Sequence, residues 1–512
     1  MTDKNPKIRT RFAPSPTGFV HIGSLRTALF AFLFARHNNG VNVLRIEDTD
    51  QNRKVEGALE NLLRVMKTVG VEFDEGFYLK DDETVGERGE FGPYLQSERL
   101  DIYHKHAREL IANKKAYYCF CSEQRLEDLR KEQTALKKPP MYDRHCRNLS
   151  ADEIQKKLEE FSAKGGSASG GKTAGKNPVI RFAIPPEGQT VIHDIVYGDI
   201  TYEHKILDDQ VIIKSDGFPT YHLAVVVDDH YMQITHVIRG EEWIPSTPKH
   251  LLIYEALGWQ PTQFAHLPLI VNADKTKLSK RQGDVSVEDF LNKGYLKEAL
   301  INFVAFLGWN PKTEQEIFSL TDLIKQFDLA KVNKSGAVFD MNKLDWINSQ
   351  YIRLRSDTDL ADRLKPYWEA SGIKISEFSD KYLAAIAALE KERLKKLSEI
   401  GERTGYFFAA PDYNPELLIW KKSDKEKTKL ALNGLADLLG KTDDFSRENL
   451  ETAIKQFIAQ NNYDNGSVLW PLRVALTGQE KSPGPFEVCA CLVLGLGKIE
   501  ILARIQTAIK KL

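Results

Sequence analysis

Two short segments of the chain carry residue types that can bind phosphate and stabilise its reactions. Residues 11–24 read RFAPSPTGFVHIGS, and Lys277 to Arg281 read KLSKR. In the first segment, prolines and a glycine set a loop that enters an apolar run with helical spacing through His21 and Gly23. A helix N-terminus offers free N–H groups and a favourable dipole to phosphate oxygens. The pattern therefore predicts a nucleotide-phosphate site with His21 as a hydrogen-bond donor.

The same predicted site includes Pro14, Gly23 and Ser24. Pro14 lies where the first strand ends, Gly23 has no Cβ and lets adenosine approach the backbone, and Ser24 begins the helix. The simpler alternative is an ordinary capped turn between a strand and a helix, in which His21 only satisfies a carbonyl. A single His-x-Gly would favour that alternative, so the choice depends on the surrounding residues.

The second segment offers cations and a hydroxyl to the same nucleotide. It contains Lys277, Ser279 and Lys280, and it follows Leu267 to Val271, which reads as an apolar strand. Open α/β sheets bind ligands at the carboxyl ends of their strands, and cations placed there stabilise transition-state charge. The alternative for a lysine-rich run is a solvated surface turn.

The elements that must position these segments predict a Rossmann-type α/β domain with a parallel sheet. A strand at Ile8 to Phe12, a helix at Leu25 to Arg36 and a strand at Val41 to Ile46 form a βαβ unit. A second group of elements follows much later in the chain: strands at Tyr221–Val227, Thr235–Arg239 and Leu267–Val271, and a helix at His250–Leu257. The Tyr221–Val227 run is almost continuously apolar, which favours a buried parallel strand.

An insertion separates the two halves of this sheet domain, and helices follow it. Beyond about residue 345 the strand signals fade, and charged amphipathic segments at Asp380–Ile400, Lys425–Leu439 and Arg447–Gln460 predict an all-α C-terminal region. The predicted boundaries are 1–116 for the first half of the sheet domain, 117–209 for the insertion with a flexible Gly/Ser tract at 163–176, 210–272 for the second half, 273–360 for the lysine loop and a connecting region, and 361–512 for the helical region.

The bulk composition indicates a cytoplasmic protein without a membrane segment. The 512 residues carry a net charge of −1, so composition alone does not suggest a nucleic-acid partner. The apolar run Val488 to Leu496 is too short to span a bilayer, and the N-terminal residues lack the apolar core of a signal peptide. Five cysteines without a secretory signal indicate reduced thiols.

One motif in the insertion matches a phosphate-binding P-loop by its letters only. Residues 166–173 read GSASGGKT, which fits G-x-x-x-x-G-K-[ST]. A working P-loop needs a buried strand before the loop and a helix after it. Here a polar helical segment precedes the motif, and Asn177-Pro178 follow it. Because the tract is rich in Gly, Ser and Ala, we interpret it as a flexible loop rather than the site of an NTPase.

Together, the two chemical segments resemble the ATP-binding pair of class I aminoacyl-tRNA synthetases. Residues 277–281 are similar to the K-M-S-K-S signature, with Leu278 for Met and Arg281 for the last Ser. The resemblance implies that ATP, with Mg²⁺, binds Pro14, His21, Gly23, Ser24, Ser279 and Lys280. It also implies that His21, Lys277 and Lys280 act in catalysis, with Lys280 stabilising the α-phosphate and the leaving pyrophosphate.

Further segments resemble the glutamyl-tRNA synthetases. They run from the first segment to near residue 480 and include Arg45–Asp50, Gly92–Arg99, Gly217–Leu223, Val237–Trp243 and Trp470–Gly478. The resemblance implies that glutamate is held by Arg11, Ala13, Ser15, Glu47, Tyr221 and Arg239. Arginine suits this role because its planar fork binds a carboxylate bidentately.

The resemblance implies that Arg11 and Arg239, with the Tyr221 hydroxyl, hold the carboxylate oxygens of glutamate, and a buried arginine is expected to reject glutamine. A buried arginine that faces the neutral amide of glutamine would be poorly compensated. The alternative for Arg239 is a structural ion pair with Glu241 or Glu242. Some members of the family have an Asn where this chain has Val225, so we assign no role to that position.

The resemblance implies a two-step ligation of glutamate to tRNA(Glu) by a monomer. The insertion would hold the acceptor end of the tRNA, the region 273–360 would contact the stem, and the helical region would read the anticodon. Three alternatives from the same residues are a variant that also charges tRNA(Gln), a non-catalytic tRNA-binding paralogue, and the P-loop NTPase. The glutaminyl enzymes carry a β-barrel anticodon domain, and the short glutamyl-queuosine relatives lack the C-terminal half, so neither fits this chain.

Three cysteines of the insertion form an incomplete zinc-like pattern. Cys119, Cys121 and Cys146 resemble the C-x-C-x24-C-x-H zinc site of some family members, but Asn148 stands at the fourth position. His145 is adjacent to Cys146 and would need awkward geometry. Because a structural zinc needs four ligands, we expect reduced thiols and no zinc.

Overall fold

A computed structural model of the chain describes residues 7–53, 55–163, 177–278 and 286–512. Ser279 and Lys280 of the lysine loop, and the P-loop look-alike at 166–173, therefore lie outside the described residues. The chain divides into two compact units. The first comprises residues 1–289 and 301–340, and the second comprises residues 290–300 and 341–512.

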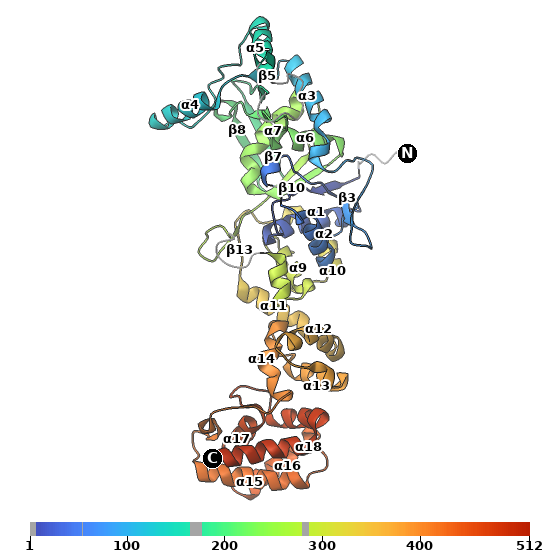
Figure 1. Cartoon of the computed structure of the whole chain (residues 1–512), viewed down its shortest axis with the longest axis vertical. Coiled ribbons are helices and arrows are strands. Elements are labelled where there is room, and N and C mark those ends of the chain that lie inside the picture. Colours follow the sequence, from blue (N-terminus) through green and yellow to red (C-terminus); the bar gives the residue numbers. More distant parts are fainter. Residues whose placement is uncertain (1–6, 54, 164–176, 279–285) are drawn as a thin grey trace. The chain divides into compact units, whose positions relative to one another are not determined.

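An eight-stranded sheet organises the first unit and positions its chemistry (Figure 1). Six neighbouring strands are parallel, and each edge strand pairs antiparallel with its neighbour. In spatial order the strands are β4 (Val85–Arg88), β3 (Glu75–Leu79), β2 (Val41–Leu44), β1 (Arg9–Phe12), β10 (His236–Gly240), β11 (Gln263–Leu267), β7 (Gln189–Asp194) and β8 (Gly198–Glu203). The predicted parallel sheet is confirmed.

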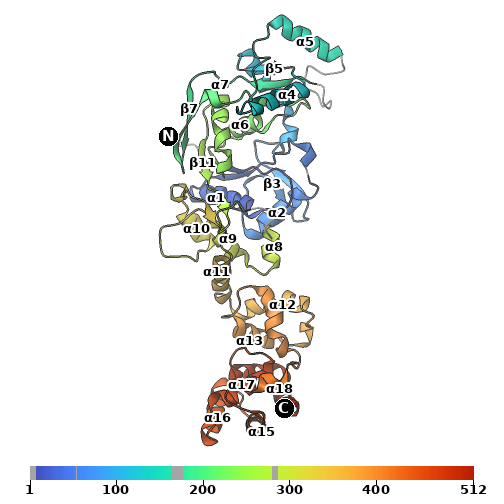
Figure 2. The ribbon, with the colours of Figure 1, turned by 90° about the vertical axis from the view of Figure 1, so that its left-hand side faces the viewer.

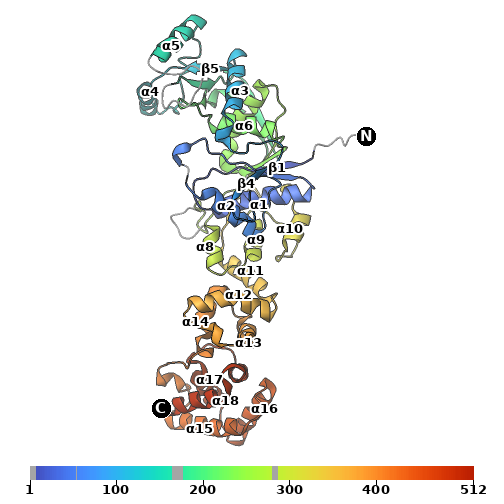
Figure 3. The same ribbon diagram turned by 45° about the vertical axis from the view of Figure 1, so that its right-hand side comes forward.

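Helices cover both faces of this sheet. On one face lie α1 (Ile22–His37) and α2 (Ala58–Val69), and on the other lie α3 (Leu100–Ala112), α6 (Tyr221–Tyr231) and α7 (Thr247–Ala256) (Figures 1 and 3). The chain leaves β1 through α1 toward β2, whereas β10 is reached through α6 on the opposite face. The neighbours β1 and β10 therefore form the switch point of the sheet, and ligands of open α/β sheets bind outside the carboxyl ends of such strands.

The prediction of a strand at Tyr221–Val227 was wrong, because this run is the first part of α6. Every residue from Leu223 to Asp229 is buried, so the helix shows no alternation of polar and apolar faces. A short apolar run of this kind cannot be assigned from periodicity alone. Tyr221 thus projects from the first turn of a helix.

The strand pairing does not follow the predicted limits of the insertion. A separate sheet contains β5 (Ala116–Cys119), β6 (Val179–Phe182) and β9 (Val211–Ile213), and α4 (Glu123–Ala135) and α5 (Ala151–Ala163) accompany it (Figure 2). The hairpin β7–β8, although within 117–209, belongs to the eight-stranded sheet. The look-alike motif therefore follows a helix, α5, and precedes a strand, β6, which is the reverse of a P-loop.

The predicted strand Leu267–Val271 is two elements rather than one. Leu267 ends β11, and Ile270–Val271 form β12, which pairs with β13 (Ala337–Val338) in a separate two-stranded sheet. The chain therefore leaves the main sheet before the lysine loop begins. The remaining helices in this part of the chain are α8 (Val287–Asn292), α9 (Lys297–Ala305) and α10 (Leu320–Gln326).

The regular elements of the second unit are helices in the part of the chain that the structure describes, as predicted. The helices are α11 (Met341–Arg353), α12 (Asp357–Ala370), α13 (Asp380–Glu390), α14 (Ile400–Thr404), α15 (Lys425–Lys441), α16 (Arg447–Gln460), α17 (Asn465–Thr477) and α18 (Pro485–Lys511). The last four pack into a bundle around α18 (Figure 3), where Cys489 and Cys491 are buried core residues. Within the described part of the chain, no helix combines the length and apolar character needed to cross a membrane.

Candidate active site

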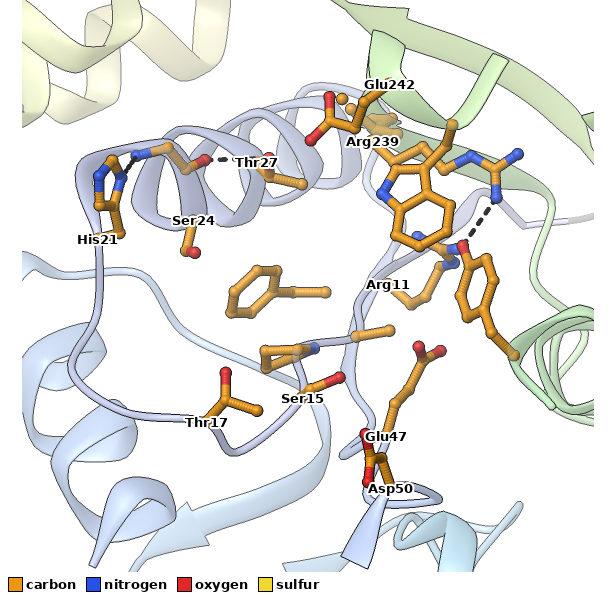
Figure 4. Close-up of a pocket in the computed structure, with 18 of the residues that line it drawn as sticks. Arg11, Ser15, Thr17, His21, Ser24, Thr27, Glu47, Asp50, Arg239 and Glu242 are labelled. Carbon is orange, nitrogen blue, oxygen red and sulfur yellow. Dashed lines mark hydrogen bonds between the residues drawn. The ribbon is translucent and has the colours of Figure 1, made fainter. Parts of the chain in front are cut away.

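A cavity of about 840 Å³ opens at the carboxyl ends of β1, β2 and β10. It brings together every predicted site residue that the structure describes. These residues are Arg11, Ala13, Pro14, Ser15, His21, Gly23, Ser24, Glu47, Tyr221, Arg239 and Lys277. Figure 4 shows the N-terminus of α1 on one side of the cavity and the two arginines on the other. The fold therefore joins a phosphate-type site to a carboxylate-type site.

His21 caps the helix that borders the phosphate side. Its Nδ1 accepts a hydrogen bond from the backbone N–H of Gly23 at 3.0 Å, so the neutral ring carries its proton on Nε2 (Figure 4). A Cβ at Gly23 would meet only this Nδ1, at 3.4 Å, among the described atoms. Packing within the described protein therefore does not require glycine at position 23. Close approach of a ligand to the backbone would require it.

We expect His21→Asn to lower kcat about a hundredfold without unfolding the protein. Asparagine is a good N-cap and keeps the hydrogen bond to the helix, but it does not present the imidazole Nε2–H to a phosphate oxygen. Steady-state kinetics of the nucleotide-dependent reaction and thermal melting of the same sample separate the two functions. An unchanged kcat would show that His21 is only a cap.

The carboxylate side contains two buried arginines at neighbouring strand ends. Arg11 and Arg239 are 4% and 5% exposed. The Arg239 guanidinium donates to the Tyr221 hydroxyl at 2.8 Å (Figure 4). Arg11 Nε lies 3.3 Å from Oδ1 of Asp229. Arg11 thus has a built-in counter-charge, whereas the Tyr221 partner of Arg239 is neutral.

The structural alternative for Arg239, an ion pair with Glu241 or Glu242, is not formed among the described residues. The Glu241 carboxylate instead accepts from the Tyr197 hydroxyl and from the backbone N–H of Leu269. Arg239 therefore lines the cavity without an ion pair to any described carboxylate.

Glu47 is held in the cavity by a buried ionic cluster. Arg45 is fully buried, and its guanidinium lies 3.0 Å from Glu47, 2.8 Å from Asp229 and 3.7 Å from Asp228. Burial raises the pKa of the Glu47 carboxyl, and the nearby Arg45 and Arg11 oppose that rise. An ammonium group bound beside Glu47 would favour its ionised form further.

Sequence reasoning missed several residues that line the same cavity: Thr17, Arg26, Thr27, Thr49, Asp50, Arg53, Lys214, Thr220, Glu242 and Trp243. Lys214 Nζ donates to the Thr49 carbonyl at 3.1 Å and lies 2.9 Å from Asp216. The Trp243 ring packs 4.3 Å from the Tyr221 ring, centroid to centroid. Some of these positions fall within the recognised segments, but their residue types did not indicate a role.

The three thiols of the insertion converge as their spacing suggests. The sulfurs of Cys119, Cys121 and Cys146 lie within 4.8 Å of one another. The Tyr142 hydroxyl lies 3.4 Å from the first two sulfurs and accepts from the Cys146 N–H at 3.0 Å. A tyrosine hydroxyl thus lies beside the thiols, and the Arg125 guanidinium donates to Cys121 Sγ at 3.4 Å. The expectation that no zinc is held here stays a prediction, which metal analysis of protein purified without chelators would test.

Comparisons with known proteins identify the family of the chain. The family of class I tRNA synthetases (E and Q), catalytic domain, matches residues 7–346, and an anticodon binding domain matches residues 359–509. The chain is 45% identical to a glutamate–tRNA ligase of Alkaliphilus metalliredigens, with 98% of both chains covered. It is 44% identical to that of Clostridium tetani, with coverage of 99% of this chain and 98% of the relative.

A solved structure extends the similarity to three dimensions. The glutamate tRNA ligase from Elizabethkingia meningosepticum, crystallised in complex with its amino acid, is 35% identical and superposes with a TM-score of 0.87 over 99% of both chains. The sequence resemblance, the parallel sheet and the cavity at its switch point lead to one conclusion. The chain belongs to the family of class I tRNA synthetases of the E and Q type.

Proposed function

We propose that this protein is a glutamate–tRNA ligase that uses ATP. In the first step a carboxylate oxygen of glutamate attacks the α-phosphorus of ATP, forming glutamyl-adenylate and releasing pyrophosphate. In the second step a ribose hydroxyl of the terminal nucleotide of tRNA(Glu) attacks the activated carbonyl, and AMP leaves. Neither step requires a nucleophile from the protein.

The observation that carries this proposal is the single cavity lined by His21 and Gly23 on one side and by Arg11 and Arg239 on the other. A ligand that fills it would carry a phosphate next to a helix N-terminus and an anionic group next to buried guanidiniums. Glutamate and ATP together have these groups. Glu47, Ala13 and Ser15 are proposed to shape the site and anchor the ammonium of glutamate.

Lys277 adds a cation to the proposed ATP site. It is exposed and lines the cavity, and Leu278 is tied back to β12 by a hydrogen bond from its N–H to the Ile270 carbonyl at 3.0 Å. We propose that the lysine loop supplies cations to the phosphates as pyrophosphate leaves. Mg²⁺ would accompany ATP and needs few protein ligands.

The roles of the remaining regions are proposed from the family. The insertion would hold the acceptor end of tRNA(Glu), the segment 273–360 would contact the stem, and the region matched as an anticodon binding domain would read the anticodon. Whether tRNA(Gln) is charged as well depends on anticodon contacts. Charging assays with both tRNAs measure this directly.

The proposal is tested by incubating the purified protein with ATP, Mg²⁺, tRNA(Glu) and labelled amino acid. We expect acid-precipitable label with glutamate and at least a hundredfold less with glutamine, because glutamine cannot compensate a buried guanidinium. Omission of ATP should abolish the signal. Failure to charge tRNA(Glu) with glutamate under these conditions would refute the proposed function.

A further inference from the structure

Arg239 lies in an environment that supplies hydrogen-bond acceptors without supplying negative charge. Its Nε donates to His266 Nε2 at 3.1 Å, and its two terminal nitrogens reach the Tyr221 hydroxyl at 2.8 Å, His250 Nδ1 at 3.4 Å and the Thr247 hydroxyl at 2.8 Å. All four partners are neutral or can be neutral. Buried arginines are ordinarily paired with a carboxylate, so this arrangement requires an explanation.

Two hydrogen-bonded chains fix the histidines in the neutral, accepting form. His266 Nδ1 lies 2.6 Å from Oδ2 of the buried Asp194, which leaves Nε2 as the acceptor facing Arg239. On the other side, His250 Nε2 lies 3.0 Å from His222 Nδ1, which leaves His250 Nδ1 to face Arg239. In both histidines the ring nitrogen that faces the arginine therefore carries no proton.

The surroundings keep these histidines uncharged at physiological pH. Burial lowers the pKa of His250 well below its ordinary value, and the adjacent Arg239 lowers it further. Burial also lowers the pKa of His222 to about 3. For His266, burial lowers the pKa more than the Asp194 hydrogen bond raises it. Asp194 itself contacts His266 and backbone N–H groups. The neutral ring of His266 therefore lies between the Asp194 carboxylate and Arg239.

We propose that Thr247, His250 and His266 are positioning residues that form a neutral acceptor shell, and that this shell makes Arg239 selective for an anionic amino-acid side chain. The inference rests on the proposed function, and it further assigns the side-chain carboxylate of glutamate to Arg239. The shell satisfies the N–H groups that do not face the cavity and fixes the plane of the guanidinium. Because it contributes no charge, the substrate has to provide the counter-ion.

The proposal predicts that a carboxylate placed in the shell erases the preference for glutamate. In Thr247→Asp the new carboxylate would lie beside the Arg239 nitrogen that now donates to the Thr247 hydroxyl. Thr247→Asn is the matched control, because it has nearly the same shape, no charge and a group that can still donate to the Trp243 carbonyl, as Thr247 does at 3.1 Å. We expect the ratio of kcat/KM for glutamate to that for glutamine, measured by charging tRNA(Glu), to fall at least a hundredfold in Thr247→Asp. In Thr247→Asn it should fall less than tenfold.

A second pair of variants protects the test against misfolding at one position. His250→Glu and His250→Gln repeat the comparison at another shell residue, and circular dichroism with thermal melting identifies any variant that does not fold. Equal ratios in the charged and neutral members of both pairs would overturn the proposal. An equal loss for glutamate and glutamine in the charged members would also overturn it, because Arg239 would then hold a group that the two amino acids share.

Arg239→Gln separates this inference from the proposed function. If the kcat/KM for glutamate stays within twofold of wild type, Arg239 does not bind the substrate and its proposed role fails with the shell. If Arg239→Gln lowers the kcat/KM for glutamate at least a hundredfold while Thr247→Asp and Thr247→Asn have equal ratios, the role of Arg239 stands. Only the neutral shell is then refuted.

Discussion

Lys280→Ala should lower the rate of glutamyl-adenylate formation about a thousandfold, whereas Lys172→Ala should leave it within twofold. Lys280 matches the family lysine that stabilises the α-phosphate and the leaving pyrophosphate. Its neighbour Lys277 lines the cavity that also contains His21 and Gly23. A cation that acts mainly on transition-state charge changes kcat more than the KM for ATP. Pyrophosphate release in a single turnover, with tRNA(Glu) present, measures the effect.

Lys172 is the matched control because it belongs to the other lysine motif of the chain. The structure places helix α5 before that motif and strand β6 after it, so the strand–loop–helix order of a P-loop is reversed. The opposite result, with Lys172→Ala inactive and Lys280→Ala active, would move the nucleotide site to the Gly/Ser tract.

The sequence predicted the N-terminal half of the site because its residues lie at the ends of consecutive elements of one βαβ unit. Arg11 lies in β1, His21 caps α1, and Glu47 follows β2. Adjacent parallel strands present their carboxyl ends at the same edge of a sheet, so residues at these strand ends lie close together. The match to family segments added Tyr221 and Arg239 from the second half.

The rest of the site was not predictable, because its parts are joined only by tertiary packing. The run at Tyr221–Val227 has no polar face, so its sequence does not show the periodicity of a helix. Asp228 and Asp229 follow this run directly, and they are the buried partners of Arg45, Arg99 and Arg11. Similarly, His250 and His266 come from α7 and β11, and neither element carries a pattern that indicates an arginine beside it.

Arg45→Met should destabilise the first unit by about 3–5 kcal/mol and raise the KM for glutamate. Burial alone would lower the pKa of Arg45, but the carboxylates of Asp229, Asp228 and Glu47 raise it well above its ordinary value. Removal of this cation leaves those buried carboxylates without their shared counter-charge. Asp228 keeps Arg99 at 2.7 Å and the Tyr103 hydroxyl at 2.9 Å as partners. The missing counter-charge therefore affects Glu47 and Asp229 most.

The consequence for function follows from what those two carboxylates hold. Asp229 pairs with Arg11 at 3.3 Å, and Glu47 is the proposed anchor of the substrate ammonium. Both ends of the proposed glutamate site therefore depend on Arg45, which lies outside the cavity lining. Without Arg45, which opposes the effect of burial, the pKa of Glu47 would rise further and favour the protonated form, which cannot attract an ammonium. The KM for glutamate should therefore rise as pH falls, more steeply in Arg45→Met than in the wild type.

Arg36→Met is the control that separates a buried pair from a surface pair in the same unit. Arg36 lies 2.8 Å from Asp74, but the two side chains are 24% and 37% exposed, so water can solvate whichever charge is left. We expect this variant to lose about 1 kcal/mol or less. Calorimetric unfolding compares the two variants, and aminoacylation at several glutamate concentrations gives the KM. Equal, small losses in both would mean that the Asp228–Asp229–Glu47 cluster is stable without Arg45, and that Glu47 owes its position to the β2 backbone alone.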